Sequence, residues 1–354
     1  MKIAVLTHDV NVSAGWGRFS DQLISGLRER GHDVLVISER GGAHPVLRRG
    51  IGVLWSVVRL LPLIRTVDIV HAMDVYPFGA IAWLATRIIR KPIIFSAQGT
   101  YSIAPLEVSR YRLLYRVMTR RVDRVLAISQ YTADRLTGAL GSSCSISVIH
   151  HGVDLERWRI DVSTGLQRDQ AVISVGSVKF RKGYHVAIRA FSEARKSFPS
   201  LQWWIVGSTR DKGYIEKLKK LADSLGVTDA IHWYENVSDD ELRRLYSRAS
   251  VFMLLSQNQG AHFEGFGLVF LEAAACGLPV IGTRDNGIQE AISDANGILV
   301  PQDDSAAARD AIVLLLSHEA IRRSMGEASV RWAKSHSIDS VIDEYELQYK
   351  EVIA

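Results

Sequence analysis

The 354-residue sequence contains only two cysteines, Cys144 and Cys276. Two cysteines are too few for a disulfide framework, and these two lack the close spacing of a metal site. The simplest interpretation is a pair of reduced thiols, which fits a cytoplasmic protein.

The sequence also lacks an apolar run of the ~18 residues that would suggest a membrane-spanning helix. The longest candidate, Val53–Ile64, is interrupted by Arg59 and Pro62. The first apolar run, Ile3–Leu6, is too short for a signal peptide and predicts a β-strand instead.

Charge is unevenly distributed along the chain. Residues 1–160 carry 21 Lys and Arg against 12 Asp and Glu, whereas the remaining residues carry 22 against 26. This asymmetry predicts that the first half faces something acidic, such as a membrane surface or a phosphorylated substrate. We expect no nucleic-acid partner, because the sequence shows no recognised nucleic-acid-binding motif.

Short runs of Val, Ile and Leu recur along the chain and alternate with segments of helical pattern. Such runs are typical of parallel strands that are buried on both faces. The alternation restarts near residue 171, which predicts an α/β fold with two doubly wound, Rossmann-like domains. The expected strands are Lys2–Thr7, Asp33–Ser38, Asp68–His71, Pro92–Ser96, Arg124–Ile128 and Ile146–Ile149, then Ala171–Val175, Gln202–Val206, Ala230–Trp233, Ser250–Leu255, Pro279–Thr283 and Gly297–Val300.

The polar stretch Asp161–Gln170 has no apolar pattern, and we interpret it as the interdomain linker. We therefore expect a first domain at residues 1–162 and a second at residues 163–335. Residues 336–354 should form a helix that packs back on the first domain. Ligands of such folds bind beyond the carboxyl ends of the strands, so a deep cleft between the two domains is expected. The apolar face of the final helix is Ile338, Val341, Ile342, Tyr345 and Tyr349.

The most informative stretch runs from Glu264 to Glu272 and reads Glu-Gly-Phe-Gly-Leu-Val-Phe-Leu-Glu. Gly265 and Gly267 follow a predicted strand and precede a predicted helix. Glycines at this place let backbone amides approach an anion at the helix N-terminus, where the helix dipole also favours negative charge. Glu272 then lies on the first or second turn, where a carboxylate can accept hydrogen bonds from ribose hydroxyls. Glu264, in the loop, can bind a second polyol, although two solvated glutamates would show the same spacing.

This stretch resembles the signature of the family 4 glycosyltransferases, which have the GT-B fold and use nucleotide sugars. The resemblance extends along nearly the whole chain, and its motifs stand in the family's order. The further matching motifs are Asp68–His71, Gln98–Tyr101, Val148–Asp154, Gly176–Gly183, Pro279–Thr283 and Asn286–Glu290. The resemblance implies retaining transfer of a hexosyl group from a nucleoside-diphosphate sugar to a hydroxyl of a glycan, a glycolipid or a lipid-linked intermediate.

The resemblance also implies roles for single residues. The ribose-binding Glu corresponds to Glu272 and the sugar-binding Glu to Glu264. The Lys of the phosphate-binding turn corresponds to Lys182, but the family's Arg position holds Ser177. Lys179 and Arg181 are the alternatives, of which we favour Arg181. The implied catalytic residues are Glu264, Lys182, Arg181 and Gln98, and the implied donor-binding residues are Gly15, Gly17, Ser177, Lys179, Arg181, Lys182, Tyr234, Val237, Glu264, Gly265, Phe266, Gly267, Leu268, Val269 and Glu272.

These residues suit the departure of a nucleoside diphosphate, because Lys, Arg and amide groups stabilise the charge that grows on the β-phosphate. The other common glycosyltransferase fold holds a metal with Asp-x-Asp, and this sequence has no Asp two residues from another Asp. We therefore expect no metal and no cofactor. The resemblance implies that the departing phosphate oxygen takes the acceptor's proton, so the carboxylate pair of a glycosidase is not required.

Gln98 departs from the family, whose members carry His before the corresponding turn. A Gln donates and accepts hydrogen bonds but carries no proton at neutral pH. We expect Gln98 to position the donor sugar. The resemblance places His71 near the cleft and His150 and His151 near the domain junction, and we assign none of the three as a base.

Two other functions remain alternatives. The loop Asn11–Arg18, which matches the family's glycine loop, gives with Ser20 and Glu39 a near match to a dinucleotide-binding fingerprint. That pattern would indicate an NAD-dependent oxidoreductase. Its first glycine lies eight residues after the strand, however, and its third glycine is replaced by Ser20. A nucleotide-sugar epimerase on the same fold is the second alternative.

Basic residues with apolar neighbours mark two segments of the first half. Amphipathic helices of this kind suit adsorption to anionic lipids, although a solvated helix face explains the pattern equally well. We therefore consider a peripheral position on the inner face of the cell membrane beside a purely cytoplasmic one. The first segment holds Arg112, Arg116, Arg120 and Arg124 with Leu113, Leu114, Val117 and Met118, and the second holds Arg48, Arg49 and Arg59 with Val53, Leu54, Val57 and Val58.

Overall fold

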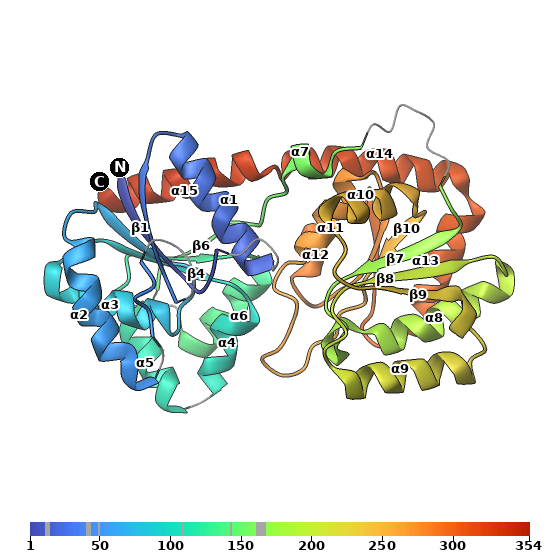
Figure 1. Ribbon diagram of the computed structural model, residues 1–354, viewed down its shortest axis with the longest axis horizontal. Helices are drawn as coiled ribbons and strands as arrows, with labels where there is room; N and C mark the ends of the chain where they lie inside the picture. The colour runs from blue at the N-terminus through green and yellow to red at the C-terminus, as the bar shows by residue number, and fades with distance from the viewer. Residues whose placement is uncertain (11–14, 40–43, 49, 108, 142–143, 161–167) are drawn as a thin grey trace. The chain divides into compact units, whose positions relative to one another are not determined.

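The structure is a computed structural model and describes residues 1–10, 15–39, 44–48, 50–107, 109–141, 144–160 and 168–354. The chain divides into two compact units, residues 1–152 with 338–354 and residues 153–337 (Figure 1). Three predicted features fall partly outside the described residues. They are positions 11–14 of the glycine loop, Arg49 of the second basic segment, and positions 161–167 of the linker.

The first unit contains a six-stranded parallel sheet of order β2-β1-β3-β4-β5-β6. β3 and β4 are buried along their whole length, as expected for apolar parallel strands covered on both faces. The strands are β1 (Lys2–Thr7), β2 (Asp33–Ser38), β3 (Ile69–Ala72), β4 (Ile93–Ala97), β5 (Arg124–Ala127) and β6 (Ile146–Val148). The helices are α1 (Gly15–Glu29), α2 (Val53–Ile64), α3 (Phe78–Ile89), α4 (Thr100–Ile103), α5 (Ser109–Thr119), α6 (Gln130–Leu140) and α15 (Ile338–Ile353).

The second unit contains another six-stranded parallel sheet, of order β12-β11-β10-β7-β8-β9. The strands are β7 (Ala171–Val175), β8 (Gln202–Val206), β9 (Ile231–Tyr234), β10 (Val251–Met253), β11 (Val280–Thr283) and β12 (Gly297–Val300). The helices are α7 (Leu155–Trp158), α8 (Tyr184–Ser197), α9 (Lys212–Ser224), α10 (Asp239–Arg248), α11 (Leu268–Ala275), α12 (Ile288–Ala291), α13 (Ser305–Ser317) and α14 (Glu319–Ser335).

The predicted pair of doubly wound α/β sheets is confirmed, and each predicted strand is present. The largest difference is at Ser250–Leu255, where β10 ends at Met253. Leu254 and Leu255 are still buried, but there the chain leaves the sheet for the loop that carries Glu264. An apolar run alone does not mark this exit, because buried loop residues are apolar too.

Helices cover both faces of each sheet (Figure 1). In the first unit α1 and α15 lie on one face, and α2, α3, α5 and α6 lie on the other. One core cluster joins β1 to the apolar sides of α1 and α15, including Val5, Phe19, Leu23, Val341 and Tyr345. In the second unit α8 and α9 lie on one face, and α10, α11 and α14 on the other.

The final helix, α15, is therefore an integral part of the first unit. Its predicted apolar face is confirmed, with Val341, Ile342, Tyr345 and Tyr349 buried. Polar contacts surround this face: Arg30 donates to Asp343 (2.8 Å), and Arg124 donates to Gln348 (2.6 Å).

His71 ties α15 to the centre of the sheet. Its Nδ1 atom lies 2.8 Å from the Tyr349 hydroxyl, and its Nε2 atom lies 2.8 Å from Ser96 Oγ. The ring is fully buried, and this burial lowers the pKa of His71 to about 3. His71 is thus a neutral structural residue that is hydrogen-bonded at both ring nitrogens.

The segment that follows Gly152 packs entirely within the second unit. Trp158 is 1% exposed and stacks edge-on with Tyr246 at a ring distance of 5.8 Å. Its carbonyl oxygen accepts a hydrogen bond from Cys276 Sγ (3.0 Å). These contacts explain why the second unit begins at Val153, whereas the sequence pattern suggested a boundary after residue 162.

The basic segment Arg112–Arg124 is not a single helix, because its last arginine lies in the strand expected at Arg124–Ile128. α5 ends at Thr119, and Arg124 is the first residue of β5. Just before β5, Asp123 accepts a hydrogen bond from the Ile93 amide (2.7 Å) at the start of the neighbouring strand β4. Arg124 then faces α15, where it pairs with Glu351.

The contact between His71 and Tyr349 can be tested by removing one hydroxyl. Tyr349→Phe leaves His71 Nδ1 buried without its partner, so we expect the free energy of unfolding to fall by about 1–3 kcal/mol in urea denaturation. Leu347, on the same helix, is 54% exposed and serves as the control. Leu347→Ala should change the free energy of unfolding by less than about 0.5 kcal/mol. Equal stability of Tyr349→Phe and the unmodified protein would contradict this role.

Candidate functional site

The strand order of the second unit has a switch point between β7 and β10, which are neighbours in the sheet. Ligands of doubly wound folds bind beyond the carboxyl ends of the strands at such a point. The motif Gly176–Gly183 follows β7, and the motif Glu264–Glu272 follows β10. The topology therefore brings the two most informative sequence motifs to the same edge of one sheet.

The turn after β7 is held in a tight geometry. The Tyr184 hydroxyl donates to the Gly176 carbonyl oxygen (2.8 Å), and residues 180–182 form one 3-10 turn. Gly183 has a φ of +71°, and a Cβ there would lie 1.7 Å from the Leu255 carbonyl oxygen. A side chain does not fit at this position, so the turn packs directly against the backbone that follows β10.

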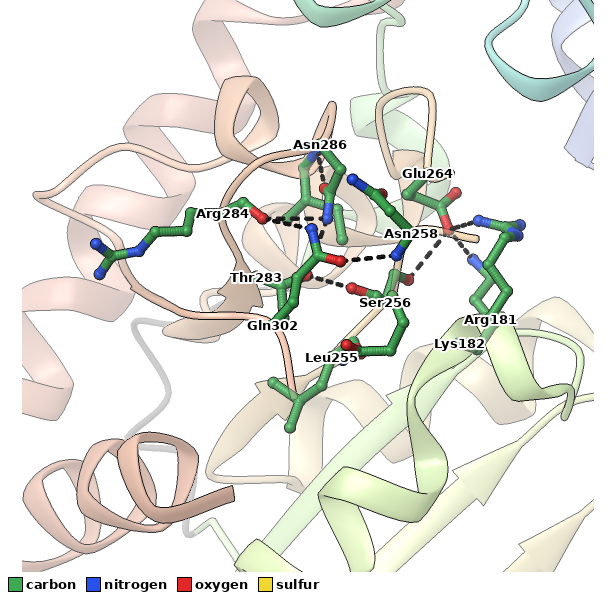
Figure 2. Close-up of polar contacts among 12 residues, drawn as sticks. Arg181, Lys182, Leu255, Ser256, Asn258, Glu264, Thr283, Arg284, Asn286 and Gln302 are labelled. Atoms are coloured by element: carbon green, nitrogen blue, oxygen red, sulfur yellow. Dashed lines mark hydrogen bonds and ion pairs between the residues drawn. The ribbon is translucent and has the colours of Figure 1, made fainter. Parts of the chain in front are cut away.

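The carboxylate of Glu264 is the centre of the site (Figure 2). Its Oε2 atom accepts hydrogen bonds from Lys182 Nζ (2.6 Å), Arg181 Nη1 (2.9 Å) and Ser256 Oγ (3.2 Å). The Glu264 side chain is 14% exposed, and those of Arg181 and Lys182 are 17% and 11% exposed. Within the described residues, Oε1 accepts no hydrogen bond, so this oxygen is available to a ligand.

Electrostatics keeps this carboxylate ionised. Burial alone would raise the pKa of Glu264, but the charges of Lys182 and Arg181, together with their hydrogen bonds, lower it to about 2. The Lys179 ammonium lies nearby, and partial burial, followed by the charges of Arg181 and Lys182, lowers its pKa. Two cations thus pair with Glu264 and a third lies near them, which leaves a positive excess at the switch point.

The glycine-bearing loop leads directly into α11. Gly267 is the residue before the helix and has a φ of +91°, and its Cβ would lie 2.9 Å from the Phe270 ring. Phe266 is buried, whereas Gly265, Leu268 and Val269 are partly exposed. The loop that carries Glu264 thus leads straight into the N-terminus of α11, and helix N-termini favour anions.

Glu272 lies in the second half of α11 and is 3% exposed. A buried carboxylate at this position is unusual in a helix that is otherwise Leu, Val, Phe and Ala. Cys276, directly after the helix, is buried as well. Burial raises the pKa of its thiol, and the nearby Glu272 charge raises it further. Cys276 is a structural residue in this environment.

The remaining predicted residues of the second unit lie along the same sheet edge. Ser177 is exposed at the start of the turn that follows β7. Tyr234 ends β9, and its carbonyl oxygen accepts a hydrogen bond from the Gly207 amide (2.9 Å). Val237 follows in the next loop and is partly exposed. β9 is two strands away from β7, so these residues can reach only the far end of an extended ligand.

Three predicted residues belong to the first unit. Gly15 begins α1, and Gly17 is buried in its first turn. Gln98 follows β4, and its backbone amide donates to Ser102 Oγ (2.9 Å). The side-chain nitrogen of Gln98 is buried and has no hydrogen-bond partner among the described residues. An unpaired buried donor is costly, which favours a ligand-binding role.

A buried polar network behind Glu264 was not predicted from the sequence (Figure 2). The motifs Pro279–Thr283 and Asn286–Glu290 pointed to this region without assigning it a role. Within it Thr283 Oγ1 donates to the Ser256 carbonyl oxygen (2.7 Å), and Asn286 Nδ2 donates to Thr283 Oγ1 (3.1 Å). Gln302 accepts from the Asn258 amide (2.7 Å).

The site combines a positive turn, free helix amides and a carboxylate with one available oxygen. Such a set can bind a phosphate group and a polyol next to each other. Among the described residues, no group of three or more His, Cys, Asp or Glu side chains is arranged to hold a metal ion.

Comparison with known proteins gives two family matches. Residues 156–332 match the model described as glycosyl transferases group 1, and residues 14–157 match the model described as Glycosyltransferase Family 4. Together the two matches include Glu264, Glu272 and both cations of the site.

Two sequence relatives carry functional names. A Mycolicibacterium smegmatis protein named GDP-mannose-dependent alpha-(1-6)-phosphatidylinositol monomannoside mannosyltransferase is 30% identical over 73% of this chain and 69% of that protein. A Streptomyces bingchenggensis protein named D-inositol 3-phosphate glycosyltransferase is 29% identical over 77% of this chain and 64% of that protein.

Two solved structures show the same fold. Anabaena HepE in complex with UDP-glucose matches with a TM-score of 0.81 at 18% identity, over 99% of this chain and 100% of that chain. A glycosyltransferase from Rickettsia africae matches with a TM-score of 0.85 at 20% identity, over 99% of this chain and 98% of that chain. The predicted GT-B fold is confirmed.

The charge balance of the site predicts how it binds a small anion. Glu264→Gln keeps the shape of the side chain but removes the negative charge that pairs with Arg181 and Lys182. We expect inorganic pyrophosphate to bind about tenfold more tightly, or about 1.4 kcal/mol, in calorimetry at low salt. Lys182→Gln should weaken the same binding. Unchanged affinity in both variants would show that pyrophosphate binds elsewhere.

Proposed function

Because this chain belongs to the group 1 glycosyltransferases, we propose that it transfers a hexosyl group from a nucleoside-diphosphate sugar to a hydroxyl acceptor. The transfer retains the anomeric configuration and requires neither a metal ion nor a cofactor. The observation that carries this proposal is the cluster of Arg181, Lys182 and Glu264, whose loop leads into the N-terminus of α11.

Each member of the cluster has a role in the proposed reaction. Lys182 and Arg181 turn from Glu264 to the diphosphate and stabilise the charge that grows on the β-phosphate as it departs. The amides of Gly267 and Leu268 support the same phosphate. Glu264, freed from its cations, accepts hydroxyl groups of the donor sugar, and Glu272 accepts those of the ribose.

No dedicated base is assigned in this mechanism. The departing phosphate oxygen takes the proton of the acceptor hydroxyl on the same face of the sugar. Gln98, with its unpaired buried amide nitrogen, positions a sugar hydroxyl near the reacting carbon. The cations supply the positive charge that a metal ion supplies elsewhere, which supports a metal-free reaction.

The relatives suggest the first substrates to test. The Mycolicibacterium smegmatis relative is named for GDP-mannose and for a phosphatidylinositol monomannoside, and another for D-inositol 3-phosphate. We propose GDP-mannose as the donor and an inositol-bearing lipid as the acceptor. The positive charge of the first half of the chain suits an acidic acceptor of this kind.

The proposed function can be tested by product analysis. With GDP-mannose and an inositol lipid, we expect a glycoside of unchanged anomeric configuration, formed at less than a twofold reduced rate in a chelator. UDP-glucose and other nucleotide sugars provide the comparison donors. Strict dependence on magnesium or manganese would contradict the metal-free mechanism. An epimerised donor without acceptor, or reduction of NAD, would establish one of the two alternative functions.

Glu272 provides a variant for the same assay. Glu272→Ala should weaken nucleoside diphosphate binding by about 1.5–3 kcal/mol, the range for hydrogen bonds to charged groups. Glu216→Ala, at an exposed position of α9, is the matched control and should leave affinity unchanged. Equal affinities of the two variants would remove Glu272 from the binding site.

We propose further that one face of the first unit adsorbs to an anionic membrane. α2 and α5 cover the same face of the first sheet (Figure 1). Both carry exposed apolar side chains: Leu54 is 72% and Val58 66% exposed on α2, and Leu113 is 68% exposed on α5. Trp55 lies between two arginines, Arg48 at 4.9 Å and Arg59 at 5.2 Å from its ring.

The charge of this face supports its adsorption to anionic lipids. Arg112, Arg116 and Arg120 are exposed beside the apolar residues of α5, and arginines at such a border attract anionic headgroups. No helix in the described ranges is both long and apolar enough to cross a membrane.

Vesicle sedimentation can test this surface. We expect binding to phosphatidylglycerol vesicles that weakens as salt rises, and at least tenfold weaker binding of the double variant Leu54→Ser and Val58→Ser. Leu347→Ser, on α15 at the opposite face, removes an equally apolar exposed residue and should bind normally. Equal binding to neutral vesicles, or an equal loss in the control variant, would contradict the proposal.

A further inference from the structure

The chain segment that leaves β10, Leu255–Asn258, contacts each part of the site. The Gln257 amide donates to the Arg181 carbonyl oxygen (2.7 Å), so the cationic turn is attached to this segment. Ser256 Oγ donates to Glu264 Oε2 (3.2 Å), so the carboxylate is attached to it as well. The spacing between cations and carboxylate is therefore set by one short segment (Figure 2).

Ser256 is itself fixed from behind by the turn after β11. Its carbonyl oxygen accepts from Thr283 Oγ1 (2.7 Å), and Thr283 Oγ1 accepts from Asn286 Nδ2 (3.1 Å). Asn286 Oδ1 in turn accepts from the Ile288 amide (2.9 Å). Ser256, Thr283 and Asn286 are fully buried. Buried and mutually bonded side chains have few other arrangements, so this chain of hydrogen bonds is rigid.

The same turn holds the backbone of the Glu264 loop. The Gly287 amide donates to the Glu264 carbonyl oxygen (2.9 Å). A Cβ at Gly287 would lie 1.9 Å from the Gly265 carbonyl oxygen. The loop therefore lies directly against the turn that also fixes Ser256.

We infer that Ser256 is a positioning residue that holds the Glu264 carboxylate while the cations bind the donor, and that Thr283 holds Ser256 in place. This inference rests on the proposed function, in which Arg181 and Lys182 turn from Glu264 to a diphosphate. Of the three donors to Oε2, Ser256 is the neutral one, and no anion competes for it strongly. It keeps its hydrogen bond when both cations leave and directs Oε1 toward the sugar.

Pyrophosphate binding tests the inference without any enzymatic activity. An anion that takes Arg181 and Lys182 leaves Glu264 with Ser256 alone, and in Ser256→Ala it leaves Glu264 with no partner. We therefore expect Ser256→Ala to bind inorganic pyrophosphate three- to tenfold more weakly by calorimetry. In a Glu264→Ala background the same substitution should have no effect, because the hydroxyl then has no carboxylate to hold. An equal loss in both backgrounds would overturn the inference.

Turnover provides the second measurement. Ser256→Ala and Thr283→Val should each lower kcat about tenfold, and Thr283→Ser, which keeps the hydroxyl, should restore at least half of the rate. Ser192→Ala removes a buried hydroxyl of α8 that donates to the Arg189 carbonyl oxygen (3.0 Å), away from the site, and it should leave kcat unchanged. Unchanged kcat in Ser256→Ala, or no recovery in Thr283→Ser, would overturn the positioning role.

The two proposals fail in different ways. If the unmodified protein transfers no sugar from any nucleotide sugar but the pyrophosphate cycle shows coupling between Ser256 and Glu264, the proposed function fails and the positioning role stands. If the protein transfers sugar but the cycle shows no coupling, the positioning role fails and the function stands.

Discussion

The ion cluster of Glu264 with Arg181 and Lys182 is the interaction on which the site depends. A carboxylate this well buried would be strongly unfavourable without partners, because burial alone disfavours its charge. Its two cations come from the turn after β7, whereas Glu264 comes from the loop after β10. The cluster therefore forms only because the doubly wound sheet places these two strands side by side. The strand order of the sheet therefore determines whether the buried charges of the site are paired.

The cluster also explains why glycines occupy the closest contacts around it. Arg181 and Lys182 reach Glu264 because Gly183 lets their turn meet the Leu255 carbonyl oxygen, and Gly287 lets the next turn meet the Glu264 loop. A single methyl group at either glycine would push the two loops apart. Hydrogen-bonded ion pairs weaken steeply with distance and misalignment. Close backbone packing is therefore a condition for the electrostatics of the site.

The fold could be predicted from the sequence because its signal is local. Runs such as Ala171–Val175 are apolar at each position, and their burial follows directly from that pattern. Glu264 and Gly267 were singled out because their motif has a chemical reason, and Lys182 because its turn resembles one of the family, and the structure brings Lys182 and Glu264 together. Ser256 and Thr283 could not be predicted, because a buried hydroxyl leaves no trace in hydrophobic periodicity. The ends of elements are hard to predict for a related reason: β10 ends at Met253, although Leu254 and Leu255 continue the apolar run and stay buried in the loop.

The ion cluster also determines how a diphosphate would replace Glu264 as the partner of Arg181 and Lys182. Before a ligand arrives, Arg181 and Lys182 are already desolvated and oriented by Glu264, so a diphosphate does not have to remove water from them. The ligand must instead replace one carboxylate, and the carboxylate must find a new partner in the same place. A sugar hydroxyl next to the diphosphate is such a partner. A ligand with both groups therefore satisfies the cations and Glu264 together, whereas a bare anion satisfies only the cations. Under the proposed function, this difference favours a phosphate linked to a polyol over a bare anion, before any contact with a base is considered.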